Sequence, residues 1–491
     1  MKTMKQATNI LSIALSSLLF VCCTEFTDLQ PKGANILSTT DDLEMLLNCE
    51  WYFYSNDVRE IGGDIIYAYS PIANELARPN KTKTAMLYTW DSSDMDHYAD
   101  LTSSDDYYQD MYGGIGKVCN PILSRIKEAK GDKEKANQLQ AEALTLRAYF
   151  HWMLANKFAK PYDPATANNT PAIIYMTEDV DITVPQQKKT LAEVYDLLIA
   201  DIEAAEKLME YVPVKAVSHM RINRACIPAV KALILLSKQD WDGASAAAKK
   251  ALDITGAIDN YNNMLTQKIT GYIIGNTYDA LLLPKDGTEG DLFFTYNIEF
   301  YDSVVPEFEK LIEPGNLALS GLANFEMMYD YMVEMLGVKA IGELLHGLPY
   351  KTVTYDLESG WNCAGVKTSY LYCLLAECEW HKGNYDAAMS YLDELRKNRI
   401  ATAMYSPLEG TGVDAAKAMN HIKETWSGEG IWSFYNYFNR KRWNGVKGWE
   451  ATYSKEMLGK TYTLAPNDAI WVAPFPKNAT SMNPNLTQNY K

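Results

Sequence analysis

The sequence lacks the short motifs that mark common catalytic sites. It has no HExxH metalloprotease motif, no GxSxG nucleophile motif and no glycine fingerprint for a dinucleotide. Its six histidines are scattered and show no metal-ligand spacing. These absences predict a binding protein and not an enzyme.

Positive charge is also scarce. Lysine and arginine number 46 against 62 aspartates and glutamates, which gives a formal net charge of −16. Removal of residues 1–22, which hold two lysines and no acid, would lower that charge to −18. Because an acidic protein repels polyanions, nucleic acid is not an expected partner, and a neutral or mixed-charge ligand is favoured.

No Gly/Ser/Pro-rich linker or low-complexity tract divides the chain. Its 491 residues alone would suggest about three domains. With 47% apolar and 12% aromatic residues, however, the chain can bury a sizeable core. We therefore predict a single composite body over residues 41–491.

The cysteines show no disulfide framework. Export would permit a bridge but does not demand one. A zinc site formed by Cys373, Cys378 and His381 is disfavoured, because residues five apart on a helix point away from one another. We predict that the cysteines after the N-terminal segment are small buried hydrophobes. They are Cys49, Cys119, Cys226, Cys363, Cys373 and Cys378.

The N-terminus resembles an export signal. Two lysines precede an apolar segment over residues 10–21, which is too short to span a bilayer. The segment ends at Cys22 and Cys23, and a cysteine at this point is what lipoprotein processing needs. We predict a signal peptide over residues 1–22 and acylation of Cys23, with Cys22 as the alternative acylated residue. An ordinary cleaved signal remains the other interpretation.

An acidic tether is predicted next, over residues 23–40, with Glu25 and Asp28 close to the cysteine. A lipid anchor in place of a transmembrane helix would hold the folded body on a membrane surface.

The stretch AEALTLRAYFHWMLANKFAKPYD, residues 141–163, predicts the main core helix. Its apolar residues recur at steps of three and four, which is typical of an amphipathic helix that faces a core. That stripe comprises Leu139, Ala143, Leu146, Phe150, Met153, Leu154 and Phe158. A second helix begins after the capping box of Thr190 and Glu193.

An internal repeat is visible farther along. The segment QDWDGASAAAKKAL, from Gln239, aligns with GNYDAAMSYLDEL, from Gly383, and an apolar helix pattern precedes each copy. A turn, an aromatic and a small residue three positions later is the tetratricopeptide way of packing two helices closely. We predict helical repeats over about 103–260 and 365–402, interrupted by an irregular insertion over about 261–362 with short strands.

Two further segments carry a family resemblance. The A-E-A-x-x-L-R-A-Y-F run and the closing WVAPFPKNATSMNPNLTQNY, within a tail over 421–491, resemble the SusD/RagB family of bacterial outer-membrane nutrient-binding lipoproteins. Trp432 departs from the family pattern, in which an arginine is usual. The resemblance implies a mainly α fold: tetratricopeptide-like helical pairs as a scaffold, with an irregular, partly β, loop-rich insertion.

The resemblance also implies a function. Such a protein captures an oligosaccharide at the cell exterior and hands it to a SusC-like TonB-dependent transporter barrel in the outer membrane. Peptide cargo, as in a RagB-like protein, is the alternative. A third interpretation, from another class, is a tetratricopeptide adaptor that binds no small ligand.

Aromatic residues are concentrated between residues 51 and 110 without sustained periodicity. A flat ring can stack on the apolar face of a sugar while adjacent polar side chains bind its hydroxyls, which makes Trp90, His97 and Tyr98 candidate ligand contacts. For any one of these rings, packing is the alternative role. The insertion adds weaker candidates: Tyr296, Asn297 and Tyr301.

Calcium is the one cofactor that the sequence leaves open. A run of aspartates could supply oxygen ligands, but it lacks the full D-x-D-x-D-G spacing, so a solvated acidic face is the alternative. The run comprises Asp91, Asp94, Asp96, Asp100, Asp105 and Asp106.

Overall fold

The computed structural model describes most of the body of the protein. The described residues are 37–53, 55, 58, 61, 66–67, 75–270, 276–296, 303–304, 312–319, 352–353, 360–431, 433–457 and 459–491. The predicted signal peptide, Cys22, Cys23 and most of the predicted tether lie outside them. No helix in this part of the chain is long and apolar enough to cross a membrane.

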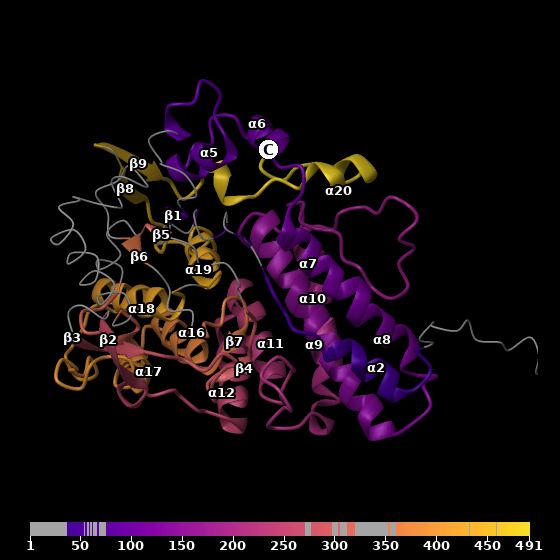
Figure 1. The fold of residues 1–491 in the computed structure, drawn as a ribbon, viewed down its shortest axis with the longest axis horizontal. Coiled ribbons are helices and arrows are strands. Elements are labelled where there is room, and N and C mark those ends of the chain that lie inside the picture. Colours follow the sequence, from indigo (N-terminus) through magenta and orange to yellow (C-terminus); the bar gives the residue numbers. More distant parts are fainter. Residues whose placement is uncertain are drawn as a thin grey trace, which may run out of the picture.

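Helices dominate the described structure (Figure 1). Those of the first half, with the π-helical turn η1, are α2 (Thr40–Leu47), α5 (Lys83–Thr89), α6 (Met95–Leu101), α7 (Asp106–Gly114), η1 (Ile115–Cys119), α8 (Asn120–Arg125), α9 (Lys133–Phe158), α10 (Leu191–Glu206), α11 (Cys226–Ser237) and α12 (Trp241–Ile254). The later helices are α16 (Thr368–His381), α17 (Tyr385–Arg396), α18 (Ala415–Glu429), α19 (Tyr435–Trp443) and α20 (Lys477–Met482). Short 3-10 turns are η2 (Met209–Tyr211), η3 (Tyr261–Asn263), η5 (Leu317–Leu319) and η6 (Ala469–Trp471).

The predicted repeat is confirmed as two helical pairs that lie side by side. Helix α11 packs on α12, α16 packs on α17, and α12 packs on α16, although the insertion separates the pairs in sequence. Helices α9 and α10 form a further pair that continues the array through α11. The chain therefore forms a small helical solenoid.

The insertion is partly β, as predicted. Its strands are β2 (Leu265–Thr270), β3 (Asn276–Leu281), β4 (Asp291–Phe293), β5 (Ser303–Val304) and β6 (Thr352–Val353), and β7 (Val366–Lys367) follows it directly before α16. Strands β2 and β3 form an antiparallel hairpin in which Leu265 lies opposite Leu281. Strand β4 pairs with β7, so the insertion joins the start of α16. Strand β5 pairs with both β6 and β1 (Ile66–Tyr67).

The C-terminal segment returns to the N-terminal helices. It contains the antiparallel hairpin of β8 (Tyr453–Met457) and β9 (Lys460–Leu464), which turns at Gly459 with φ +72°. Backbone hydrogen bonds tie Lys477 and Asn478 to the carbonyls of Thr102 and Ser103. Consequently α5, α6, the β8–β9 hairpin and α20 gather at one end of the molecule (Figure 1, top).

Helix α9 is buried more completely than the sequence predicts. The pattern indicated one core-facing stripe, whereas every side chain from Ala141 to Phe158 is buried. The reason is that α2, α7, α8, α10, α11 and α19 all pack against it. The helix is central, so it has no solvent-facing side over this length.

Burial of α9 requires partners for its charged side chains. Arg147 donates two hydrogen bonds of 2.7 Å to the carboxylate of Asp201 on α10. Glu142 accepts two from Arg221, and Lys157 donates to Asp105 at 2.7 Å. Each buried charge of α9 is thus paired with a group from another segment, which offsets the cost of desolvating it.

The six predicted buried cysteines are all free thiols. Five are buried and Cys49 is partly buried, which confirms the prediction of hydrophobe-like packing. Burial raises the pKa of the Cys119 thiol well above its ordinary value.

We predict that Arg147→Met destabilises the protein by about 3–5 kcal/mol, because it leaves the Asp201 carboxylate buried without its cation. The measurement is the free energy of unfolding from urea denaturation. The control is Lys215→Met, which removes an exposed ion pair with Glu289 and should cost less than about 1 kcal/mol. Equal losses in the two variants would contradict the pairing argument.

A buried histidine adds a pH dependence. His151 donates from Nδ1 to the Arg147 carbonyl, and its Nε2 accepts from the Met176 N–H. Both ring nitrogens of the neutral imidazole therefore form hydrogen bonds. Burial lowers the pKa of His151 from 6.5 to about 3. The unfolded chain therefore binds more protons between these pH values, and stability falls as the pH drops through this window.

We predict that this histidine alone costs about 2–3 kcal/mol of stability between pH 6.5 and pH 4.5. The measurement is the free energy of unfolding as a function of pH for the wild type and for His151→Gln, which cannot titrate. The variant should show a shallower loss over the window. Parallel curves would mean that His151 does not titrate differently in the folded and unfolded states.

Candidate functional site

A cavity of about 770 Å³ lies between the N-terminal aromatic region and the C-terminal hairpin. It is lined by residues within 75–93, which include α5, and by residues 460–463 of β9, and we call it the α5–β9 cavity. Two segments almost 400 residues apart in sequence therefore form one site, because the tail packs back onto α6 and the loop after it.

Trp90 occupies the C-terminal end of α5 in an uncommon conformation. Its φ is 51°, in the left-handed region that bulky residues rarely adopt, and its N–H caps the helix by donating to the Leu87 carbonyl. Such outliers are concentrated at functional sites. The side chain lines the cavity yet is only 4% exposed, and the Lys455 ammonium lies 3.8 Å from the ring centroid.

Four of the charged side chains that line the cavity form two ion pairs, and Lys460 on β9 adds a fifth charge. The Lys81 ammonium binds Asp91 and the hydroxyl of Ser93, and Arg78 binds Glu75 at 2.6 Å. Burial opposes ionisation of Asp91, but the hydrogen bonds from Lys81 and Ser93 outweigh it and hold the pKa of that carboxyl below its ordinary value. The cavity thus presents donors and acceptors, and its three cations and two carboxylates give it a small net positive charge.

Hydroxyl groups and a tyrosine complete the opposite wall. Thr461, Tyr462 and Thr463 contribute from β9, and the Tyr462 ring is partly exposed. This combination of a ring with alternating donors and acceptors suits a ligand that has both an apolar face and many hydroxyls.

His97 on α6 supports the wall of the cavity that carries Lys81. Its backbone N–H donates to Asp94, the N-cap of α6, and its Nε2–H donates to the Lys81 carbonyl at 2.9 Å. The ring therefore holds the segment that carries Lys81. Tyr98, the next residue, is fully buried in the core.

Tyr296 belongs to a second aromatic pair. Its ring stacks on Tyr52 with centroids 5.4 Å apart. The Tyr296 backbone donates to the Trp51 carbonyl and accepts from the Phe53 N–H. Tyr52 is 40% exposed, and its hydrogen bond to Glu50 raises its pKa to about 12. Neither tyrosine lines the α5–β9 cavity.

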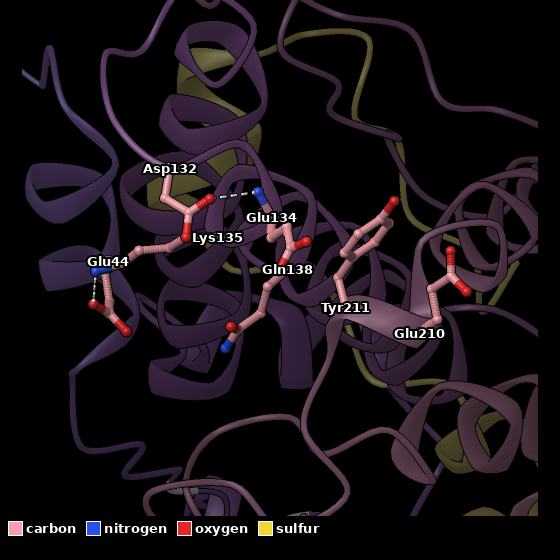
Figure 2. Close-up of a pocket in the computed structure, with 7 residues that line it drawn as sticks. All are labelled: Glu44, Asp132, Glu134, Lys135, Gln138, Glu210 and Tyr211. Atoms are coloured by element: carbon pink, nitrogen blue, oxygen red, sulfur yellow. Dashed lines mark hydrogen bonds and ion pairs between the residues drawn. The ribbon is translucent and has the colours of Figure 1, made fainter.

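A different hollow, of about 640 Å³, lies between α2, the start of α9 and η2, and we call it the α2–α9 hollow. Figure 2 shows Lys135 extended toward Glu44, with Tyr211 and Glu210 on the opposite side. Lys135 also binds Asp41 at 2.7 Å, so its charge is already matched. The lining is mainly carboxylates, which suits a neutral ligand less well than the α5–β9 cavity does.

Two comparisons bear on the fold and its family. Residues 56–236 match a SusD-like family described as starch-binding and associating with the outer membrane. A putative sugar binding protein from Bacteroides vulgatus aligns over 93% of this chain and 99% of its own, with a TM-score of 0.63 and 16% identity. A SusD superfamily protein from Bacteroides thetaiotaomicron aligns over 92% and 99%, with a TM-score of 0.60 and 16% identity.

Residues 56–236 thus match a SusD-like family, and the described body has a SusD-like fold. A SusD-like carbohydrate binding protein from Bacteroides vulgatus aligns over 92% of this chain and 98% of its own, with a TM-score of 0.55 and 16% identity. No curated protein matches the sequence. At these identities the structural likeness establishes the fold alone.

The structure places four of the six candidate residues. Trp90 lines the α5–β9 cavity, His97 supports its wall, and Tyr98 lies in the core. Tyr296 stacks on Tyr52 elsewhere. Asn297 and Tyr301 lie outside the described residues. For all six, the ligand role stays a prediction.

Sequence reasoning missed the contribution of β9. The run SKEMLGKTYTL contains a Gly between two segments rich in β-forming residues, a hairpin signal that would have predicted the strands. Nothing in the local sequence indicates that Tyr462 would face the segment that carries Trp90, because only tertiary packing brings them together.

The aspartates of the acidic run act separately. Asp94 and Asp105 cap α6 and α7, Asp91 binds Lys81, and Asp96 accepts from the hydroxyl of Tyr490. Within the described ranges, no three His, Cys, Asp or Glu side chains are grouped so that they could hold a metal ion.

Proposed function

We propose that this SusD-like protein is a surface-exposed glycan-binding lipoprotein that captures oligosaccharides and delivers them to a SusC-like TonB-dependent transporter. The family description, starch-binding and associating with the outer membrane, supports this direction. The sugar- or carbohydrate-binding names of two structural neighbours do so too. In this proposal the protein binds and does not catalyse.

The α5–β9 cavity is the observation that carries the proposal. Its two ion pairs, Lys81 with Asp91 and Arg78 with Glu75, cancel in charge and still offer hydrogen-bonding atoms. A neutral oligosaccharide can bind such a wall without leaving a buried charge uncompensated. The Tyr462 ring supplies a partly exposed apolar surface.

Attachment to the membrane is part of the proposal. Acylation at Cys23, or alternatively at Cys22, would anchor the body at the exterior face of the outer membrane through the tether over residues 23–40. A single acyl chain binds a bilayer only weakly, so full acylation or the transporter itself would hold the protein in place.

The proposal is tested by calorimetric titration of the chain from Thr24 onward against neutral glycans, acidic glycans and mixed peptides. Binding to a neutral glycan supports it. Binding to peptides alone would move the protein to the RagB-like alternative. No detectable binding to any ligand of the panel would overturn glycan capture by the free protein and favour the adaptor interpretation.

We predict that Tyr462→Ala lowers the affinity for that glycan by about 5- to 150-fold, the equivalent of about 1–3 kcal/mol for a lost aromatic platform. Trp90→Ala should cost a similar amount if its ring stacks on the sugar. The matched control is Tyr211→Ala, a partly exposed tyrosine of the α2–α9 hollow, which should leave affinity within about twofold.

Urea denaturation of each variant separates lost binding from lost folding, which is necessary for the buried Trp90. Unchanged affinity in Tyr462→Ala and Trp90→Ala, with both variants folded, would contradict binding in the α5–β9 cavity.

For the transporter, we predict that affinity purification of the tagged protein from detergent-solubilised outer membranes recovers one large β-barrel protein in near-equal amount. The helical solenoid offers an extended surface for such a partner. A tagged lipoprotein of unrelated fold from the same membranes is the control. Recovery of no barrel protein, or of the same barrel with the control, would contradict delivery to a SusC-like transporter.

A further inference from the structure

A further concave surface has a different lining from the α5–β9 cavity. It is a groove of about 900 Å³ lined by α7, η1 and α8 on one side and by residues within 174–186 on the other, with Met482 and Asn483 at its rim. We call it the α7–α8 groove. Leu37, the first residue that the structure describes, also lines it.

The groove has fixed walls. The Tyr112 hydroxyl donates to the Ile174 carbonyl at 2.8 Å, and the Asn120 amide donates to the Met176 carbonyl at 3.2 Å. Asn120 in turn accepts from Arg147 of the central helix α9. The two sides are therefore held apart at a set distance by hydrogen bonds that connect to the core.

Its lining is apolar and open. Ile182 is 80% exposed, Val184 is 50% exposed and Met482 is 83% exposed, which is unusual for three large apolar side chains at one rim. On the helical side, Gly113 and Gly116 share one face, and a Cβ at either would meet no atom within 4 Å. Bare backbone at this wall leaves room for another polypeptide to approach closely.

The groove also carries unmatched positive charge. Lys117 on η1 and Arg125 at the end of α8 are both exposed. Within the described part of the chain, neither forms an ion pair. In a chain of net charge −16, two unpaired bases beside an apolar groove indicate an occupant with carboxylates close to apolar side chains.

The N-terminal segment of this same chain has that chemistry. Residues 24–36, TEFTDLQPKGANI, lie outside the described residues and contain Glu25 and Asp28 beside Phe26 and Leu29. The chain leaves the described body at Leu37, inside the groove, while the Ser38 carbonyl accepts from the Lys130 N–H. Thirteen residues can reach up to about 40 Å, which is ample to follow the groove.

We propose that residues 24–36 bind in the α7–α8 groove, with Glu25 and Asp28 on Lys117 and Arg125 and with Phe26 and Leu29 against the apolar rim. The tether is then a docked strap that sets where the chain leaves the body. With an anchor at Cys23, a consequence that rests on the proposed function, the strap would orient the body on the membrane. The docking itself is independent of any glycan.

The test is amide hydrogen exchange, read by mass spectrometry, on the chain from Thr24 onward without ligand. Residues 24–36 should exchange at least about tenfold more slowly than the same sequence as a free peptide. Lys117→Glu/Arg125→Glu should remove that protection. The matched control, Lys160→Glu/Lys447→Glu, makes the same charge change at exposed lysines outside the groove and should retain it.

Restoration of the charge match provides a second check. Adding Glu25→Lys/Asp28→Lys to Lys117→Glu/Arg125→Glu should recover the protection. Exchange of residues 24–36 at the free-peptide rate in the wild type would overturn the proposal. So would protection that grows with protein concentration, which would identify a second copy as the occupant, or protection that the Lys117 and Arg125 changes leave intact. None of these outcomes bears on glycan affinity, so the proposed function is tested separately.

Discussion

The full burial of α9 is the constraint on which the rest of the structure depends. A helix whose side chains are buried on all sides from Ala141 to Phe158 must find a partner for each charge that it carries. Arg147 takes Asp201 from α10, Glu142 takes Arg221 from the segment before α11, and Lys157 takes Asp105 from the start of α7. These pairs fix which segments surround α9, and the solenoid continues from them through α11, α12, α16 and α17.

The candidate site is a consequence of the same packing. The segment around α5 and α6 lies at the same end of the molecule as the β8–β9 hairpin (Figure 1). The two meet there because the C-terminal tail packs against the loop after α6. That closure creates the α5–β9 cavity and leaves its ion pairs part-exposed and mutually neutralised. The α7–α8 groove differs in kind, because its bases are unmatched and its rim is apolar. We therefore expect the two surfaces to suit different partners by the same electrostatic rule.

Periodicity and motifs predicted the helical scaffold well, because repeated helix pairs leave a local signature in the sequence. The alignment of Trp241 with Tyr385 anticipated that α12 and α17 would occupy equivalent places in their pairs. Single-stripe reasoning failed for α9, since Glu142, Arg147 and Lys157 look solvent-facing until their partners are known. For the site, the aromatic count led to Trp90, but its covered ring, the core position of Tyr98 and the arrival of Tyr462 depend on contacts across hundreds of residues.

We propose above all that the α5–β9 cavity holds a glycan. The most direct measurement is a crystal structure of the chain from Thr24 onward with the tightest-binding oligosaccharide of the titration panel. We expect a sugar ring against Tyr462, with its hydroxyls bonded to Asp91, Ser93 or Lys81. A sugar bound on the Tyr52–Tyr296 pair or in the α2–α9 hollow, with the α5–β9 cavity empty, would contradict it.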